Sequence, residues 1–376
     1  MKVLVAGDFC PQSRVAKLFK NKEFSIVLGN IKSIVNQSNY SILNFECPIA
    51  SDTAKPIEKW GPNLKCEESG VEAVKWLGFK CVTIANNHIL DYGEEALKNT
   101  INAFNMFDID YVGGGMNYQD ASKILYKQIE DKSIAIINCC EHEFSIASEY
   151  NAGAAPLNAI RQYYLIKEAK SKADYILVIV HGGHEHFQYP SLRMQETYRF
   201  FIDAGADVIV NHHQHCYSGY EKYKNGIIFY GLGNFCFDRD PIKKNELWNY
   251  GYMVNIEFNE GPIKFDIIPY IQCGEDPTIE ILPKESFNNS LQTLNKIISQ
   301  PEELKKVVDN YYATTLKISQ GLFEPYQNRF LLGAQMRGWI PFLMGKNHRL
   351  SLHNNIMCEA HLDKIKYFLE YIYRNN

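Results

Sequence analysis

Residues 175–186 read YILVIVHGGHEH, and residues 207–215 read DVIVNHHQH. In each stretch an apolar run typical of a buried β-strand ends directly in histidines, and six of the eleven histidines lie between positions 181 and 215. Ligands of open α/β sheets bind in the crevice beyond the carboxyl ends of the strands. The two stretches therefore predict neighbouring strands whose ends carry imidazoles into a common site.

Other predicted strands end in the same way. Asp8 follows an apolar run at 2–7, Glu46 follows residues 40–45, and the pair Asn87-His88 follows residues 80–85. Each of these alone is typical of a turn or a cap, but carboxylates, an amide and imidazoles at successive strand ends predict a metal site. This oxygen and nitrogen donor set suits Mn, Zn or Fe rather than a thiolate site. It is large enough for two divalent ions about 3.5–4 Å apart.

Strand-like and helix-like patterns alternate over the first 240 residues. The expected helices are 12–37, 67–77, 93–107 and 190–204, and the expected strands include 133–138, 175–180, 207–210, 227–230 and a hairpin of 252–258 with 263–270. Such alternation predicts an α/β fold with buried, largely parallel sheets. From about residue 285 only helical patterns appear, at 302–319 and 353–373. We therefore expect a catalytic domain at 1–282 and a helical C-terminal extension at 283–376.

Composition narrows the class of protein. The 376 residues are 46% apolar, and the net charge of −4 disfavours binding to nucleic acid or to an anionic membrane. The ten cysteines include no CxxC pair, so we expect reduced, buried thiols. The chain begins without a secretory apolar region, and its longest apolar run, 175–180, is far short of the roughly 20 residues that cross a bilayer. These features predict a soluble, cytoplasmic protein without a transmembrane segment.

Seven motifs occur in an order and spacing that resemble a known family. They are VAGD (5–8), LNFECPI (43–49), IANNHILDYG (84–93), YVGGGMN (111–117), VIVHGGHEH (178–186), DAGADVIVNHHQHCYSGYE (203–221) and YGLGNFCFD (230–238). Together they resemble the CapA-type capsule-synthesis proteins, which are associated with poly-γ-glutamate and surface-polymer production. That family is a distant relative of the calcineurin-like metallophosphoesterases. The resemblance covers about residues 2–260 and implies a two-sheet sandwich flanked by helices, a four-layer αββα arrangement.

The resemblance also implies roles for individual residues. The implied metal ligands are Asp8, Glu46, Asn87, His181, His213 and His215, with Glu46 bridging two ions. His88 corresponds to a histidine that is not a ligand but protonates the leaving group, with Asp91 orienting it. Residues expected to contact the substrate or the ligands are Asn44, Asn86, Glu185, His212 and Asn234. His212 is equally compatible with a direct ligand.

The chain departs from the family pattern at three positions. Metallophosphoesterases usually have Asp-x-His at the first strand, where this chain has Cys10, which is either a ligand for a softer metal or a buried thiol. Family members often carry His-Trp-Gly-x-Glu-Tyr at the fifth motif. Here Gly182 replaces the Trp and His186 replaces the Tyr, so we expect an altered substrate wall.

These observations predict a metal-dependent hydrolase, most simply a phosphoesterase-type enzyme that uses a metal-bound hydroxide in capsule or surface-polymer metabolism. Its substrate would be a small molecule or polymer with an anionic group, and amide or γ-glutamyl hydrolysis would use the same chemistry. The alternative is a non-catalytic or transferase component of capsular polymer assembly, for poly-γ-glutamate or a polysaccharide, whose metal is structural or binds polymer. We expect the C-terminal helices to form a homo-oligomer contact. Residues 329–350, which mix basic and apolar side chains, either lie on a membrane surface or pack on protein.

Overall fold

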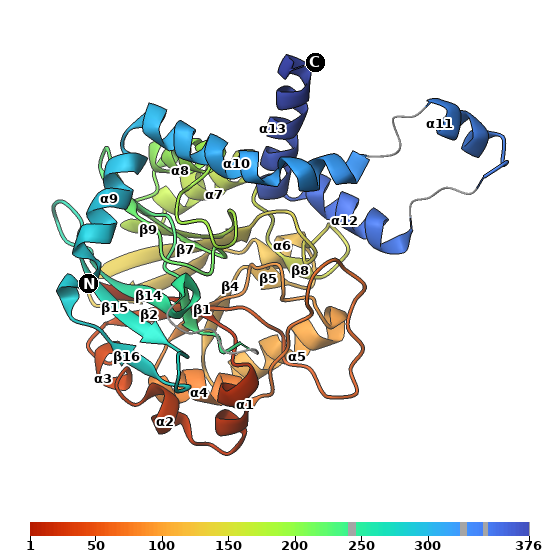
Figure 1. Cartoon of the computed structure of the whole chain (residues 1–376). Helices are drawn as coiled ribbons and strands as arrows, with labels where there is room; N and C mark the ends of the chain where they lie inside the picture. Colours follow the sequence, from red (N-terminus) through yellow and green to blue (C-terminus); the bar gives the residue numbers. More distant parts are fainter. Residues whose placement is uncertain (240–245, 324–328, 341–344, 376) are drawn as a thin grey trace.

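The computed structural model describes residues 1–239, 246–323, 329–340 and 345–375, and its body is built from two β-sheets that face each other (Figure 1). The first sheet has eight strands, in the order β16-β15-β14-β1-β2-β3-β4, with β13 also paired to β1. Its strands are β1 (Lys2–Phe9), β2 (Tyr40–Phe45), β3 (Cys81–Thr83), β4 (Asp110–Val112), β13 (Asn234–Cys236), β14 (Tyr250–Glu257), β15 (Lys264–Gln272) and β16 (Ile279–Ile281). Strands β1 to β4 run parallel, and β14 begins the antiparallel side.

The second sheet has six strands in the order β11-β12-β10-β9-β7-β6. They are β6 (Leu125–Ile129), β7 (Lys132–Cys140), β9 (Tyr175–His181), β10 (Val208–His212), β11 (Tyr220–Tyr223) and β12 (Gly226–Phe229). The four central strands are parallel, and the two edge strands are antiparallel. A short ribbon of β5 (Gly114–Gly115) and β8 (Gly153–Ala154) stands apart.

Alternate side chains of the central strands pack in different layers. Val3 and Val5 of β1 belong to the apolar cluster between the sheets, together with Leu177 of β9. Their neighbours Leu4 and Ala6 belong to the cluster beneath the helices. Successive side chains of a strand point to opposite faces, so these strands are buried on both sides and read as continuous apolar runs. The predicted fold class, a two-sheet sandwich flanked by helices, is confirmed.

Helices cover the outer faces of the sandwich. They are α1 (Ser13–Lys20), α2 (Phe24–Leu28), α3 (Lys32–Val35), α4 (Ser69–Leu77), α5 (Gly93–Met106), α6 (Tyr118–Ala121), α7 (Ala159–Lys170) and α8 (Leu192–Ala204). The helical stretch predicted at 12–37 is helical in the structure, where it is divided into three short helices. Lys22, at φ 62°, takes a left-handed conformation just after α1, and Gly29 follows the end of α2. Sequence patterns also missed α7 and the strands β4, β6, β11 and β16.

The C-terminal part is helical in the residues that the structure describes. It comprises α9 (Asn288–Ile298), α10 (Pro301–Phe323), α11 (Arg329–Met336), α12 (Lys346–Met357) and α13 (Glu359–Asn375). Leu304, Val308 and Tyr312 of α10 pack against Phe187 and Tyr189, which follow β9. Helix α11 extends away from the body (Figure 1). None of the described helices is both long and apolar enough to span a bilayer.

The segment 329–350 lies only partly within the described residues, because 341–344 fall outside them. Met336 and Trp339 are largely exposed, so this part of the segment does not pack closely on the α/β body. Whether residues 283–376 form a separate domain, and whether they mediate a homo-oligomer, stay predictions.

Candidate metal centre

The predicted ligands meet at one end of the sandwich, where the parallel strands of both sheets finish. The first sheet contributes Asp8 in β1, Glu46 just after β2 and Asn87 after β3. The second contributes His181, the last residue of β9, and His212, the last residue of β10. His213 and His215 lie in the loop that follows β10. The site therefore spans both sheets, with the carboxylates on one and the imidazoles on the other.

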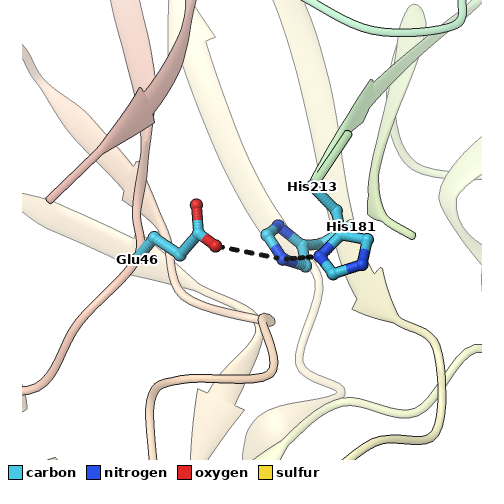
Figure 2. A group of neighbouring side chains, drawn as sticks. All are labelled: Glu46, His181 and His213. Atoms are coloured by element: carbon cyan, nitrogen blue, oxygen red, sulfur yellow. Dashed lines mark hydrogen bonds and ion pairs between the residues drawn. The ribbon is translucent and has the colours of Figure 1, made fainter. Parts of the chain in front are cut away.

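Glu46 is the most informative residue of this cluster (Figure 2). Its Oε1 lies 3.6 Å from His181 Nε2 and 3.7 Å from His215 Nε2. The residue is completely buried, and neither carboxylate oxygen has a hydrogen-bond partner in the part of the chain that the structure describes. Burial, together with the negative charge of Asp8, raises the pKa of Glu46 well above its usual range. Because an unpaired buried carboxylate is costly, this arrangement fits a site that holds a cation.

His181 reinforces that conclusion. Its Nε2 has three neighbours that can act as ligands, namely Asn87 Oδ1 at 3.0 Å, His213 Nδ1 at 3.1 Å and the Glu46 carboxylate. A ring N–H can donate fully to only one of them, whereas a shared metal ion satisfies all. Burial and the neighbouring imidazoles lower the pKa of His181 well below its usual range, so the ring is neutral. Metal ligation requires the neutral imidazole.

Four polar groups lie close to the Asp8 carboxylate. Asn44 Nδ2 donates to its Oδ1 at 2.8 Å, and the backbone N–H of His213 donates to its Oδ2 at 3.2 Å. His212 Nδ1 is 3.3 Å from Oδ1, and His215 Nδ1 is 3.7 Å from Oδ2. Burial by itself would raise the pKa of Asp8, but the contacts with His212 and His215 outweigh it and lower the pKa. Asp8 is therefore an ionised carboxylate.

The loop after β10 has an unusual backbone. His213 and His215 have φ values of 90° and 53°, a region that residues other than glycine seldom adopt. Such strain clusters at functional sites. Asn234 Oδ1 lies 2.9 Å from His215 Nδ1 and can accept a hydrogen bond from a proton on that nitrogen, so that the unprotonated Nε2 faces Glu46. Hydrogen bonds of this kind fix the tautomer of a ligating histidine.

The structure also groups the residues into candidate metal-binding triads. Three of these groups lie at the strand ends: Glu46 with His181 and His213, Asp8 with Glu46 and His215, and Glu185 with His213 and His215. Glu185 is half-exposed and lies at the mouth of the cluster. His212, by contrast, is buried, and neither ring nitrogen makes a hydrogen bond in the described part, although it is close to Asp8.

The predicted acid lies beside the cluster. His88 Nδ1 is 2.6 Å from Asp91 Oδ2, and both side chains are buried. Asn86 holds this turn, because its Oδ1 accepts from the His88 backbone N–H at 3.1 Å and its Nδ2 donates to the Phe45 carbonyl at 2.9 Å. Asn86 therefore positions the loop that carries Asn87 and His88.

Lys59 lies beside His88 and Asp91, and the sequence analysis did not predict it there. Its ammonium forms an ion pair with Asp91 and lies 3.1 Å from His88 Nδ1. Burial lowers the pKa of Lys59 even though Asp91 opposes the shift. Lys59 comes from a loop with no motif of its own, so only the folded chain shows where its side chain goes.

Cys10 lies among apolar side chains and other thiols. It belongs to none of the candidate metal-binding groups that the described residues form. Its Sγ accepts a hydrogen bond from Gln12 Nε2 at 3.3 Å, and it packs in the apolar core with Cys47 and Cys66. Burial raises the pKa of the Cys10 thiol. Of the two alternatives for this position, the geometry favours the buried thiol.

The altered fifth motif is coupled to the C-terminal helices. A Cβ on Gly182 would lie 2.6 Å from Glu141 Cγ, so the Glu141 side chain occupies that space. Glu141 in turn binds Arg193 at 2.7 Å and accepts from the backbone N–H of Ala360 at 3.2 Å. The next histidine of the motif, His184, lies 3.0 Å from the Tyr312 hydroxyl of α10. Residues of α10 and α13 therefore contact the segment that carries the fifth motif, next to the candidate metal centre.

Fold and site together define an α/β sandwich with a buried carboxylate–imidazole centre suited to divalent ions. Residues 2–239 match the family model described as "Bacterial capsule synthesis protein PGA_cap", and the chain belongs to this family. The family resemblance seen in the seven motifs is thereby confirmed.

Two curated relatives are both named CapA. The chain is 34% identical over 301 residues to the capsule biosynthesis protein CapA of Bacillus anthracis, which covers 77% of this chain and 72% of that protein. It is 31% identical over 236 residues to the PGA biosynthesis protein CapA of Bacillus subtilis (strain 168), covering 62% of each. Among solved structures, a putative 5′-nucleotidase from Staphylococcus aureus is 16% identical, with a TM-score of 0.45 over 78% of this chain and 58% of that one.

Proposed function

We propose that this protein is a metal-dependent hydrolase of the phosphoesterase type that acts in capsule or surface-polymer metabolism. The observation that carries the proposal is the buried Glu46 carboxylate, which faces His181 and His215 with no hydrogen-bond partner among the described residues. Membership of the capsule-synthesis family supports the biological setting.

The residues that would hold the metal are those at the strand ends. They are Asp8, Glu46, Asn87, His181, His213 and His215, with Glu46 between two ions of Mn, Zn or Fe. Such ions lower the pKa of water and neutralise the charge that develops on an anionic substrate. His212 and Asn44 keep Asp8 ionised and oriented. Asn234 orients His215 in the same way.

His88 would supply the proton for the leaving group. With Nδ1 engaged by Asp91, the atom left to deliver a proton is Nε2. Burial, helped by the positive charge of Lys59, lowers the pKa of His88, so the protonated ring is the less populated form near pH 7, but it is a stronger acid when it forms. A purely structural or polymer-binding metal site does not require an oriented acid. This pair therefore supports catalysis over the alternative of an accessory component.

The substrate would be a small molecule or polymer bearing an anionic group. We place the reaction in the cytoplasm, as the sequence predicts, and we favour a phosphoester over a γ-glutamyl amide. The same residues serve either bond, because both reactions need an activated water and a protonated leaving atom.

The test is a substrate panel assayed with Mn and with Zn. Wild type and His88→Ala are compared on phosphomonoesters, phosphodiesters and γ-glutamyl amides, with His353→Ala, an exposed histidine of α12, as the matched control. We expect metal-dependent hydrolysis that His88→Ala reduces and His353→Ala leaves unchanged. A metal-loaded wild type that cleaves none of the three classes would overturn the proposal and favour the accessory role.

A further inference from the structure

A second cluster of metal-ligand side chains lies away from the strand ends, where α13 meets the catalytic body. Glu143 comes from the loop after β7, Cys358 joins α12 to α13, and His361 lies in the first turn of α13. One ligand atom from each lies within 4.8 Å of the others.

The Glu143 side chain lacks the partners that a buried carboxylate needs. It is 7% exposed, and its Oε2 is buried with no hydrogen-bond partner in the described part of the chain. Its one ion-pair contact there is with His361, whose Nδ1 lies 3.9 Å from Glu143 Oε1.

A fourth donor adjoins the cluster. Asn354 is buried, and its Oδ1 has no hydrogen-bond partner among the described residues. Its Nδ2 lies 3.1 Å from His361 Nδ1, and a half-turn of the amide would bring the oxygen there instead. Ligand atoms bound at 2.0–2.1 Å in a tetrahedral site are about 3.3 Å apart. The 3.9 Å between Glu143 Oε1 and His361 Nδ1 is longer than this, so the side chains would have to move inward by a few tenths of an ångström to share an ion.

We propose that Glu143, Cys358 and His361 bind a zinc ion, with Asn354 or water as the fourth ligand. Sulfur, nitrogen and oxygen donors in this number are typical of Zn²⁺ sites. Because Cys358 supplies a thiolate, this site differs in chemistry from the oxygen and nitrogen centre at the strand ends.

The ion would fasten the C-terminal helices to the catalytic body. Neighbouring contacts already tie the same two segments, since His142 Nδ1 lies 2.6 Å from Glu359 Oε1 and Glu141 accepts from the Ala360 N–H. A zinc ion bound by Glu143 and His361 would add a third link between the loop after β7 and the start of α13. It would thereby hold α13 in place beside the wall of the main centre, whatever reaction that centre performs.

Cobalt substitution tests the proposal on the full chain. Cobalt bound to a thiolate absorbs in the near ultraviolet by sulfur-to-metal charge transfer, whereas cobalt bound by oxygen and nitrogen does not. We expect this absorption in wild type and in Cys81→Ser, a buried cysteine of β3 that serves as the control. We expect its loss in Cys358→Ser, together with the loss of one zinc per chain by elemental analysis.

Two further variants keep the outcome decisive. Glu143→Gln retains the thiolate and should weaken cobalt affinity by about tenfold or more. It decides the question if Cys358→Ser fails to fold. Glu46→Gln should keep the charge-transfer absorption, which separates this site from the proposed catalytic centre. Absence of the absorption in wild type, its persistence in Cys358→Ser, or unchanged affinity in Glu143→Gln would overturn the proposal.

Discussion

Lys59 and Asp91 form an ion pair whose side chains are only 1% and 0% exposed. Asp91 also accepts hydrogen bonds from His88 Nδ1 at 2.6 Å and from the Leu64 backbone N–H at 2.6 Å. The lysine thus compensates the charge of the carboxylate that orients the proposed acid. Removing one partner of a buried pair leaves the other charge uncompensated, which is the costly case.

Lys59→Met should therefore lower the free energy of unfolding by about 3 kcal/mol, measured by urea denaturation with metal present. Lys65→Met is the matched control, because Lys65 pairs with the largely exposed Asp52. Exposed pairs contribute about 0–1 kcal/mol, so the control should change little. Equal effects of the two substitutions would show that the Lys59 pair is not buried in solution.

His88→Ala should keep the bound metal and lower kcat by about 10²–10⁴ for substrates with poor leaving groups. Substrates with good leaving groups should lose less, because they need less protonation. Elemental analysis and a leaving-group series make the two measurements. If His88→Ala empties the site, His88 is a ligand and its assignment as the acid is wrong.

Glu46→Gln should lose at least one metal ion and nearly all hydrolysis, with the fold intact by circular dichroism. The amide keeps the size of the side chain but removes the charge that offsets repulsion between two cations. Cys47→Ala is the neighbouring control, since its thiol packs in the apolar core beneath the helices. Full metal occupancy in Glu46→Gln with loss in Cys47→Ala would contradict the proposed ligand set.

Removal of metal should destabilise the protein. An ion that binds only the folded chain stabilises it by about 2.7 kcal/mol at one hundred times its Kd. Chelation should therefore lower Tm, and added Mn or Zn should restore it, as followed by calorimetry. The restoration should be smaller in Glu46→Gln, and an equal response in that variant would place the stabilising ion elsewhere.

Gly182→Trp should loosen the C-terminal helices. Any side chain at this position displaces Glu141, which would then lose its contacts with Arg193 and with the Ala360 N–H. Limited proteolysis should cut the region after residue 283 faster than in wild type. Gly261→Ala, at a site with nothing within 4 Å of the added Cβ, provides the control. Unchanged proteolysis would mean that other contacts hold α13.

The sequence was informative where function depends on strand ends. Glu46 and His181 each follow a buried apolar run, and parallel strands bring such ends to one edge of a sheet, so their meeting could be predicted. Membership of the family and the two-sheet fold were instead implied by the resemblance of the seven motifs. The roles assigned to individual site residues stay predictions, although the structure brings those residues together.

Other features depend on contacts that no local pattern records. Lys59 reaches Asp91 from a loop, and Tyr312 reaches His184 across 128 positions of sequence. The helical stretch predicted at 12–37 is divided into three helices, and the sequence analysis did not predict the break at the left-handed residue Lys22. Periodicity reports which side chains face the core, and it does not report a turn that keeps the same face buried.

The division of the main centre between two sheets has a mechanical consequence. Asp8 and Glu46 belong to one layer of the sandwich, whereas His181 and His213 belong to the other. An ion bound by residues of both sheets would link the two layers. It could contact all its ligands only while the distance between the sheets is maintained. Any loosening of the apolar interior between the sheets would therefore be felt first as weakened metal affinity, well before the chain unfolds.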